Sequence, residues 1–205
     1  MTLHEHLTRS RTRYVRKVRA LRSVTKQLSA RDVAAFVLLT PRQPYERAVA
    51  AWRTYRETGS TSGPGMHLRR GAYIEALPSA TRLRRRRGES RAAWAERLQR
   101  TVKGLGPAKA PFLTSLLEPT GRDVPVCVDV WMLRGLGFTE TRARRGDAST
   151  VRAAQNICEF MAKRYAMPRF AWQWAAWDYF RTRGIERKQQ VMFVSETYIE
   201  RDLGV

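Results

Sequence analysis

Apolar residues recur at helical spacing along most of this 205-residue chain, and residues that start helices precede the apolar runs. Ser29 and Asp32 have the spacing of a capping box, which satisfies two backbone N–H groups at a helix start. Ser90 and Ser149 precede two further runs, and Pro168 precedes another, where a first turn tolerates proline. Stretches with the alternating pattern of strands are scarce and connections are short. We therefore predict an all-α fold, a compact helical domain.

The chain divides into three predicted parts. Residues 1–28 form a basic amphipathic arm, residues 29–183 the helical domain, and residues 184–205 a C-terminal tail that fits either a strand or a helix. Polar loops are predicted at 59–65 and 137–147. The helices of the domain are expected at about 33–39, 45–58, 67–77, 90–102, from 107 or 108 onward, and at 149–165 and 168–183.

Composition narrows the class of protein. Hydrophobic residues make up 43% of the chain, which is enough to bury a core. No apolar run reaches the roughly 18 residues of a membrane span and no apolar signal segment is present, so we expect no membrane contact and a cytoplasmic location. Two cysteines and three histidines argue against a disulfide framework and against zinc or iron–sulfur sites, so we expect no metal and no cofactor.

The chain is strongly basic. Lys and Arg number 39 against 18 Asp and Glu, which gives a formal net charge of +21. Because like charges repel one another in a compact chain, this excess predicts a polyanionic partner. We expect that partner to be double-stranded DNA, bound by a monomer.

Two segments concentrate the positive charge. Residues 1–31 hold nine Lys or Arg and one Glu, and their apolar residues keep helical spacing. This pattern is typical of an amphipathic helix that is either simply solvated or follows phosphates. Residues 82–87 hold five Arg in six positions, whose mutual repulsion predicts a surface loop. Arg85 and Arg86 in that loop are candidate DNA contacts, with a solvated loop as the alternative. The apolar stripe of the first helix consists of Tyr14, Val18, Leu21 and Leu28.

A glycine turn separates two predicted helices in the middle of the chain. Gly104 and Gly106 form the tight turn, and the second helix starts directly after it, at residue 107 or 108. Proline at 107 suits a first helical position, because its missing N–H would be unpaired there. Such a turn directs free backbone N–H groups outward at a helix N-terminus, which favours anions, and Lys103 and Lys109 add charge. We interpret the segment as a helix-hairpin-helix phosphate clamp.

Asp129 stands near the start of an apolar segment about twenty residues after this turn. A carboxylate there is stabilised by the helix dipole, and its ordinary role is to cap the helix. The order of glycine turn, apolar helix, short loop and Val128-Asp129 before a second apolar helix makes Asp129 a catalytic candidate as well.

These motifs resemble those of the helix-hairpin-helix DNA glycosylase superfamily, which includes endonuclease III and 8-oxoguanine glycosylases. The family signature is a Gly-hydrophobic-Gly hairpin followed by a Val-Asp-x-His-like motif with an essential Asp. Here these are Gly104-Leu-Gly106 and Val128-Asp129-Val-Trp131. Residues 38–47, Leu-Leu-Thr-Pro-Arg-Gln-Pro-Tyr-Glu-Arg, are similar to the family's Leu-Ser-x-Gln/Asn segment. The matches cover about residues 30–180, and the chain is also similar to short phage-encoded glycosylase-like proteins.

The resemblance implies a DNA glycosylase-like fold and an enzyme that flips a nucleotide and cleaves the N-glycosidic bond of a modified or damaged base. DNA phosphates would lie on the amides of Gly104 and Gly106. Arg42 or Gln43 would fill the space that the flipped nucleotide leaves. Asp129, as carboxylate, would stabilise the positive charge that develops on the sugar.

Tryptophans are the candidates for stacking on the flipped base. Trp131, which replaces the His of the family motif, is the base-pocket candidate. Core packing is the alternative for each of the C-terminal tryptophans, Trp172, Trp174 and Trp177, and we expect it most strongly for the last two.

The chain departs from the family at the position of the Schiff-base lysine. Bifunctional members carry it two residues after the second hairpin Gly, where this chain has Ala108. Lys109 lies one residue further, about 100° around a helix, and stays a catalytic candidate. The departure predicts a monofunctional glycosylase. Two alternatives are a transferase in which an amine displaces pyrophosphate from an activated 5-hydroxymethyluracil, and a DNA-binding protein without catalysis.

Overall fold

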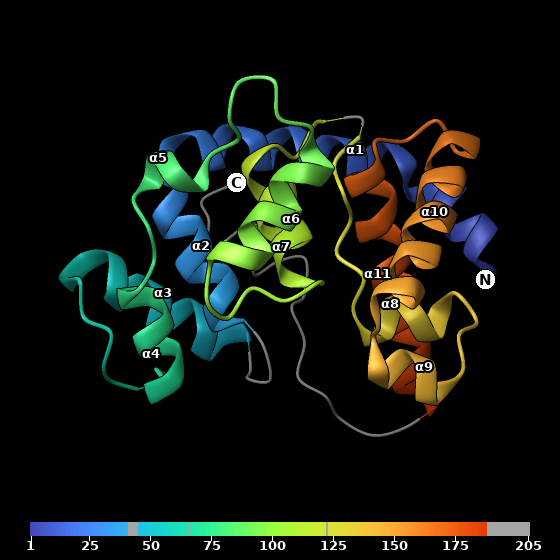
Figure 1. The fold of residues 1–205 in the computed structure, drawn as a ribbon. Coiled ribbons are helices and arrows are strands. Elements are labelled where there is room, and N and C mark those ends of the chain that lie inside the picture. The colour runs from blue at the N-terminus through green and yellow to red at the C-terminus, as the bar shows by residue number, and fades with distance from the viewer. Residues whose placement is uncertain (41–44, 65, 122, 188–205) are drawn as a thin grey trace.

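A computed structural model describes residues 1–40, 45–64, 66–121 and 123–187 of the chain. All regular structure in these residues is helical (Figure 1), which confirms the all-α prediction. The helices are α1 (Leu3–Gln27), α2 (Ala30–Leu39), α3 (Tyr45–Thr58), α4 (Leu68–Glu75), α5 (Ala80–Leu83), α6 (Arg91–Thr101), α7 (Lys109–Leu117), α8 (Val130–Gly135), α9 (Glu140–Arg145), α10 (Ala148–Arg164) and α11 (Arg169–Arg187).

The N-terminal helix belongs to the core, so the prediction of an appended arm over 1–28 is wrong. α1 packs along α11 and also against α7. Tyr14, Val18 and Leu21 of the predicted stripe are each at most 3% exposed, and so is Leu7. Leu28, the fourth predicted member, follows the end of α1 and is partly buried. Tyr14 Oη also donates a hydrogen bond of 2.5 Å to Asp178 Oδ2 on α11. The amphipathic pattern was correctly identified, but its apolar stripe is buried against the rest of the chain.

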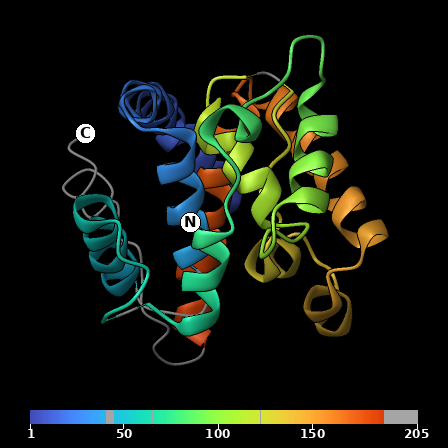
Figure 2. The same ribbon diagram turned by 60° about the vertical axis from the view of Figure 1, so that its left-hand side comes forward.

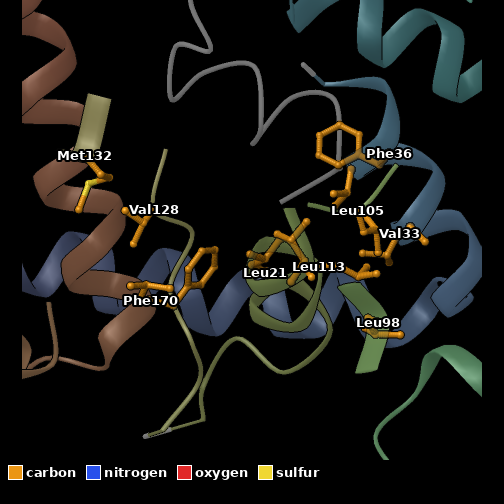
Figure 3. Packing of buried hydrophobic residues seen from close by; sticks show 14 of the residues in the cluster. Leu21, Val33, Phe36, Leu98, Leu105, Leu113, Val128, Met132 and Phe170 are labelled. Carbon is orange, nitrogen blue, oxygen red and sulfur yellow. The ribbon is translucent and has the colours of Figure 1, made fainter. Parts of the chain in front are cut away.

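The core is continuous across the molecule. Leu21 of α1, Leu113 of α7 and Phe170 of α11 lie together near its centre (Figure 3). α2 is buried over most of its length, which agrees with its almost entirely apolar sequence. Among the C-terminal tryptophans, Trp172 is the fully buried one, whereas Trp174 and Trp177 lie at the edge of the core. The expectation that Trp174 and Trp177 are the most core-like is therefore wrong.

Two of the three predicted serine caps, Ser29 and Ser90, start helices. Ser29 and Asp32 form the predicted capping box, and Ser90 Oγ accepts a hydrogen bond from the amide of Ala93. The prediction for Ser149 is wrong, because Asp147 caps α10 two residues earlier. Its carboxylate accepts hydrogen bonds from the Thr150 amide at 2.8 Å and from the Ser149 hydroxyl at 2.7 Å. A carboxylate is the stronger acceptor at a positive helix end.

The predicted loop over 137–147 contains the short helix α9, so this prediction is also wrong. Thr139 caps it, and Gly146 ends it in the left-handed conformation at φ +56°. Glu140 accepts hydrogen bonds from Arg134 at 2.8 Å and from Arg144 at 2.6 Å, which holds α9 to α8. The segment is too polar and too short for its periodicity to be visible, and its helix depends on these charge pairs.

A close glycine contact seats α8 against α11. A Cβ atom on Gly135 would lie 2.0 Å from the Phe180 ring, so only glycine allows the backbone of α8 to rest on this ring. This contact orients the helix whose first turn carries Asp129.

Among the described helices, none combines the length and the apolar composition that a membrane span needs. The tail prediction for 184–205 falls mostly outside the described residues; α11 continues to Arg187.

Candidate nucleic-acid interface

The predicted glycine turn connects the end of α6 to the start of α7. Gly104 has φ +86°, a conformation that L-residues rarely adopt, and the Leu105 amide donates a hydrogen bond of 3.2 Å to the Val102 carbonyl. A Cβ atom on Gly104 would approach Tyr73 Cδ2 to 2.5 Å and Leu38 Cδ2 to 2.9 Å. Leu105 is buried in the core. The turn is therefore held tightly on its inner side.

The outer side of the same turn is open. A Cβ atom on Gly106 would meet no atom within 4 Å, and Lys103 and Pro107 are exposed. Within the part of the chain that the structure describes, the amides of Gly106 and Ala108 donate no hydrogen bond to another protein group. Backbone donors at a helix N-terminus with a cation beside them form an anion-binding arrangement. The geometry of the turn is thus suited to a phosphate.

Lys109 braces the turn. Its Nζ donates a hydrogen bond of 3.1 Å to the Gly104 carbonyl, and the side chain is partly buried. The ammonium group therefore closes the turn from the α7 side, a structural role that the sequence did not reveal.

Asp129 is the N-cap of α8. Its Oδ1 accepts a hydrogen bond of 2.9 Å from the Met132 amide, and its Oδ2 accepts one of 2.8 Å from Trp177 Nε1. Burial raises the pKa of the Asp129 carboxyl above its usual value, while these hydrogen bonds act in the opposite direction. The residue as a whole is partly exposed, but its carboxyl group is largely desolvated and both of its oxygens accept hydrogen bonds.

Three side chains hold the extended segment that leads to Asp129. Ser115 Oγ donates a hydrogen bond of 2.9 Å to the Pro125 carbonyl, and Gln155 Nε2 donates one of 3.1 Å to the Val126 carbonyl. Gln173 Oε1 accepts one of 3.3 Å from the amide of Cys127. These contacts come from α7, α10 and α11, so three helices fix the approach to Asp129.

Two tryptophans near the carboxylate have arginines over their rings. Trp131 is partly exposed, with the Arg134 guanidinium 5.1 Å from its ring centroid. Trp177, which donates to Asp129, has Arg181 at 4.7 Å. The hydrogen bond from Trp177 to Asp129 was not predicted from the sequence. No local pattern reveals it, because 48 positions separate the two residues.

The turn and Asp129 lie at different helix junctions. α6 descends to the turn, α7 rises from it, and the segment after α7 descends again to α8 (Figure 1), whose N-cap is Asp129. The hydrogen-bond partners of the Asp129 side chain lie on α8 and α11 and not on the turn.

The arginine-rich loop lies at the opposite end of α6. This helix has eleven residues, so its two ends are about 16 Å apart. The loop over 84–90 precedes the helix, while the glycine turn follows it. Arg85 and Arg86 therefore do not extend the surface of the turn.

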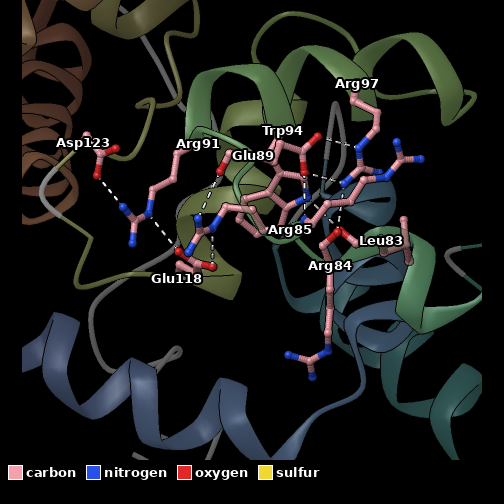
Figure 4. Close-up of polar contacts among 10 residues, drawn as sticks. Leu83, Arg84, Arg85, Glu89, Arg91, Trp94, Arg97, Glu118 and Asp123 are labelled. Carbon is pink, nitrogen blue, oxygen red and sulfur yellow. Dashed lines mark hydrogen bonds and ion pairs between the residues drawn. The ribbon is translucent and has the colours of Figure 1, made fainter.

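The same loop is held by arginine contacts (Figure 4). Arg97 donates to the Arg82 and Arg84 carbonyls, at 2.8 Å each, and pairs with Glu89 at 2.7 Å. These contacts hold the pKa of the Glu89 carboxyl down at about 2. The loop is thus a surface loop, as predicted, but an ordered one.

Within this loop the two candidate DNA contacts differ. Arg85 pairs with Glu118 at 2.9 Å, so its guanidinium is committed to the protein. The predicted role of Arg85 as a free contact to DNA is not supported, because Glu118 occupies it. Arg86 is exposed. The other predicted DNA contacts, Arg42 and Gln43, lie outside the described residues.

No group of three or more His, Cys, Asp or Glu side chains within the described ranges is arranged to bind a metal ion. Comparison with known proteins found no matching family model, no matching curated protein and no matching solved structure.

Proposed function

We propose that this protein binds double-stranded DNA through the α6–α7 turn and cleaves the N-glycosidic bond of a modified or damaged base, with Asp129 as the essential carboxylate. The observation that supports this most is the open outer side of the turn. The amides of Gly106 and Ala108 donate no hydrogen bond to another group among the described residues, and Lys103 beside them is exposed. The net charge of +21 attracts the phosphates of DNA to such a surface.

In the proposed mechanism, the turn binds the DNA backbone and does not contact the bases. It therefore positions the strand without sequence specificity. A nucleotide then leaves the duplex, at a cost of a few kcal/mol that is smallest for a damaged or mispaired base. Trp131, which lies next to Asp129 in sequence and is partly exposed, provides an aromatic surface for that base.

Asp129 acts on the sugar in this mechanism. As the glycosidic bond breaks, positive charge develops on the sugar, and a nearby carboxylate stabilises it and orients a water molecule. Trp177 and the Met132 amide hold the two carboxylate oxygens in fixed positions. A carboxylate that is already desolvated and oriented interacts more strongly with a developing charge than one in water.

The test is an assay on duplexes that carry a panel of modified bases, with free bases and nucleosides measured by mass spectrometry. We expect base release by the wild type, none by Asp129→Asn, and retained DNA binding by that variant, because the cap is kept while the charge is lost. Gly106→Asp provides the matched test of the turn. Its carboxylate would enter open space, so the fold is kept while phosphate is repelled.

Each outcome of this assay assigns a function. Base release by Asp129→Asn at the wild-type rate would contradict the mechanism. New base adducts without strand loss would indicate the transferase alternative.

DNA binding without catalysis is the second candidate, and one observation favours it. Both oxygens of Asp129 accept hydrogen bonds that stabilise the fold, which is sufficient reason for an Asp at this position. DNA binding that Gly106→Asp weakens, with no base released from any duplex of the panel, would establish this alternative.

A further inference from the structure

The outer face of α1 carries a long row of cations. At about 100° per residue, the buried positions 7, 14, 18 and 21 share one face of the helix, and the basic residues cover the rest. From Arg9 to Lys26 this basic face extends for about 25 Å. Seven of its cations are exposed: Arg9, Arg11, Arg13, Arg16, Arg19, Arg22 and Lys26.

Among the described residues, few acidic groups lie near five of these cations. Carboxylates elsewhere pair with arginines: Glu118 with Arg85 and Arg91, and Glu140 with Arg134 and Arg144. The only acidic residue of α1 is Glu5, which bonds to the amide of Thr2 at the helix start.

Five of the exposed cations of α1 are not paired with a carboxylate within the part of the chain that the structure describes. Among the described residues, no ion pair with a carboxylate involves the following five cations of α1: Arg9, Arg16, Arg19, Arg22 and Lys26.

This face lies away from the α6–α7 turn. The apolar stripe of α1 rests on α11 and α7, so its cations point outward from the core. In Figure 1, α1 runs across the upper part of the molecule and the α6–α7 turn lies below it, and in Figure 2 α1 is seen nearly end-on at the upper left. A single straight duplex seated on the turn would not reach the outer face of α1.

We propose that the outer face of α1 is a second DNA-binding surface, so that one molecule holds two duplex segments, one on α1 and one on the turn. This inference rests on the proposed function for the turn. Four of the cations, Arg9, Arg16, Arg19 and Lys26, lie within about 100° of one another on the side opposite the buried stripe. They extend over about 25 Å, which is shorter than one helical turn of B-DNA, about 34 Å, so the phosphates of one turn provide enough partners for them. The contacts involve charge alone and read no sequence.

Nucleic acid fits this surface better than a membrane does. A helix that lies on a membrane inserts its apolar face between lipids. The apolar face of α1 is already covered by α11 and α7, with Leu7, Tyr14 and Val18 each at most 1% exposed. Binding at this surface therefore depends on charge alone, and DNA presents a regular array of charged phosphates.

The test compares two variants of equal charge. The α1 variant replaces Arg9, Arg16, Arg19 and Arg22 by Gln, and the control variant replaces four exposed arginines on other helices, Arg47, Arg69, Arg152 and Arg164, by Gln. Circular dichroism and thermal unfolding confirm that each is folded. The readout is bridging: an immobilised 20-base-pair duplex captures a second, fluorescent duplex only if one protein molecule binds both.

We expect bridging by the wild type and the control variant, and at least a tenfold loss of bridging in the α1 variant. Binding of a single duplex persists in the α1 variant, with a log–log salt slope smaller by up to about 4, because each phosphate contact contributes about 0.9. Gly106→Asp also loses bridging, yet keeps single-duplex binding through α1.

Three outcomes would overturn the inference. The first is equal bridging by the α1 and control variants, and the second is an unchanged salt slope in the α1 variant. The third is an α1 variant that binds DNA like the wild type but no longer binds vesicles containing 30% phosphatidylserine. Failure of the proposed function gives a different pattern. In that case Gly106→Asp changes neither bridging nor binding, while the α1 variant still lowers the salt slope.

Discussion

At the scale of single residues, the two glycines of the α6–α7 turn have different reasons to be glycine. Gly104 combines a left-handed backbone with a packed inner side against Tyr73 and Leu38. Gly106 faces open space. The sequence pattern Gly-x-Gly identifies the turn but does not distinguish these roles, because they depend on α4 and α2, which pack against the turn from far along the chain.

We expect Gly104→Ala to lower the free energy of unfolding by about 1–3 kcal/mol, because it adds backbone strain to a steric clash. Gly106→Ala is the control and should change stability by less than about 0.5 kcal/mol. Urea unfolding monitored by tryptophan fluorescence measures both. Equal effects of the two substitutions would show that the turn is not packed as described.

Asp129 has an observed role as the N-cap of α8 and a proposed role in catalysis. Burial raises the pKa of its carboxyl, and the hydrogen bond from Trp177 lowers it. Since the proposed mechanism needs the ionised form, the rate of base release should rise with pH through this raised pKa and then level off.

We therefore expect Trp177→Phe to move the acid limb of the pH–rate profile to higher pH. The substitution removes a donor that favours the charged form, so the pKa of Asp129 rises further. Trp174→Phe is the matched control, since Trp174 makes no contact with Asp129 that would change its pKa. An acid limb that stays in place in Trp177→Phe would mean that Asp129 is not the titrating group.

At the scale of elements, the ends of most helices follow from local residues, and the exceptions follow from charge pairs. α3 has the predicted bounds, 45–58, whereas α9 arises where a loop was predicted. The arginine-rich loop is likewise ordered by Glu89 and Arg97, whose side chains are only 12% and 11% exposed. Glu140, in contrast, is half exposed although it also pairs with two arginines.

We expect Glu89→Gln to cost about 2–3 kcal/mol of stability and Glu140→Gln less than about 1 kcal/mol. Both carboxyls have a pKa of about 2, but only the first substitution leaves a guanidinium buried without its partner. The contribution of Glu89 is present above its unfolded pKa, near 4.5, and disappears as the pH falls toward 2. Thermal unfolding at pH 7 and pH 2.5 tests this, because the difference between wild type and Glu89→Gln should shrink at the lower pH.

At the scale of the whole molecule, the net charge of +21 opposes folding and, in the proposed function, favours DNA binding. Added salt screens both effects, so it should act on them in opposite directions. The fold leaves seven cations of α1 exposed to solvent.

We accordingly expect the thermal midpoint of the free protein to rise between 50 and 300 mM NaCl, while its affinity for duplex DNA falls by at least tenfold. Differential scanning fluorimetry and fluorescence anisotropy measure the two on the same sample. A midpoint that does not change with salt would show that self-repulsion is already neutralised within the fold, and an affinity that does not change would remove the electrostatic basis of the interface.

The sequence was sufficient to predict the helical class, most helix starts, the glycine turn and the capping position of Asp129, because these depend on neighbours within a few residues. It did not reveal that Trp177 binds Asp129, that Arg85 is paired with Glu118, or that α1 completes the core. Those contacts join residues tens or more positions apart along the chain. When the helices pack together, each apolar stripe and each charge meets one of many possible partners. A local sequence pattern does not specify which partner that is.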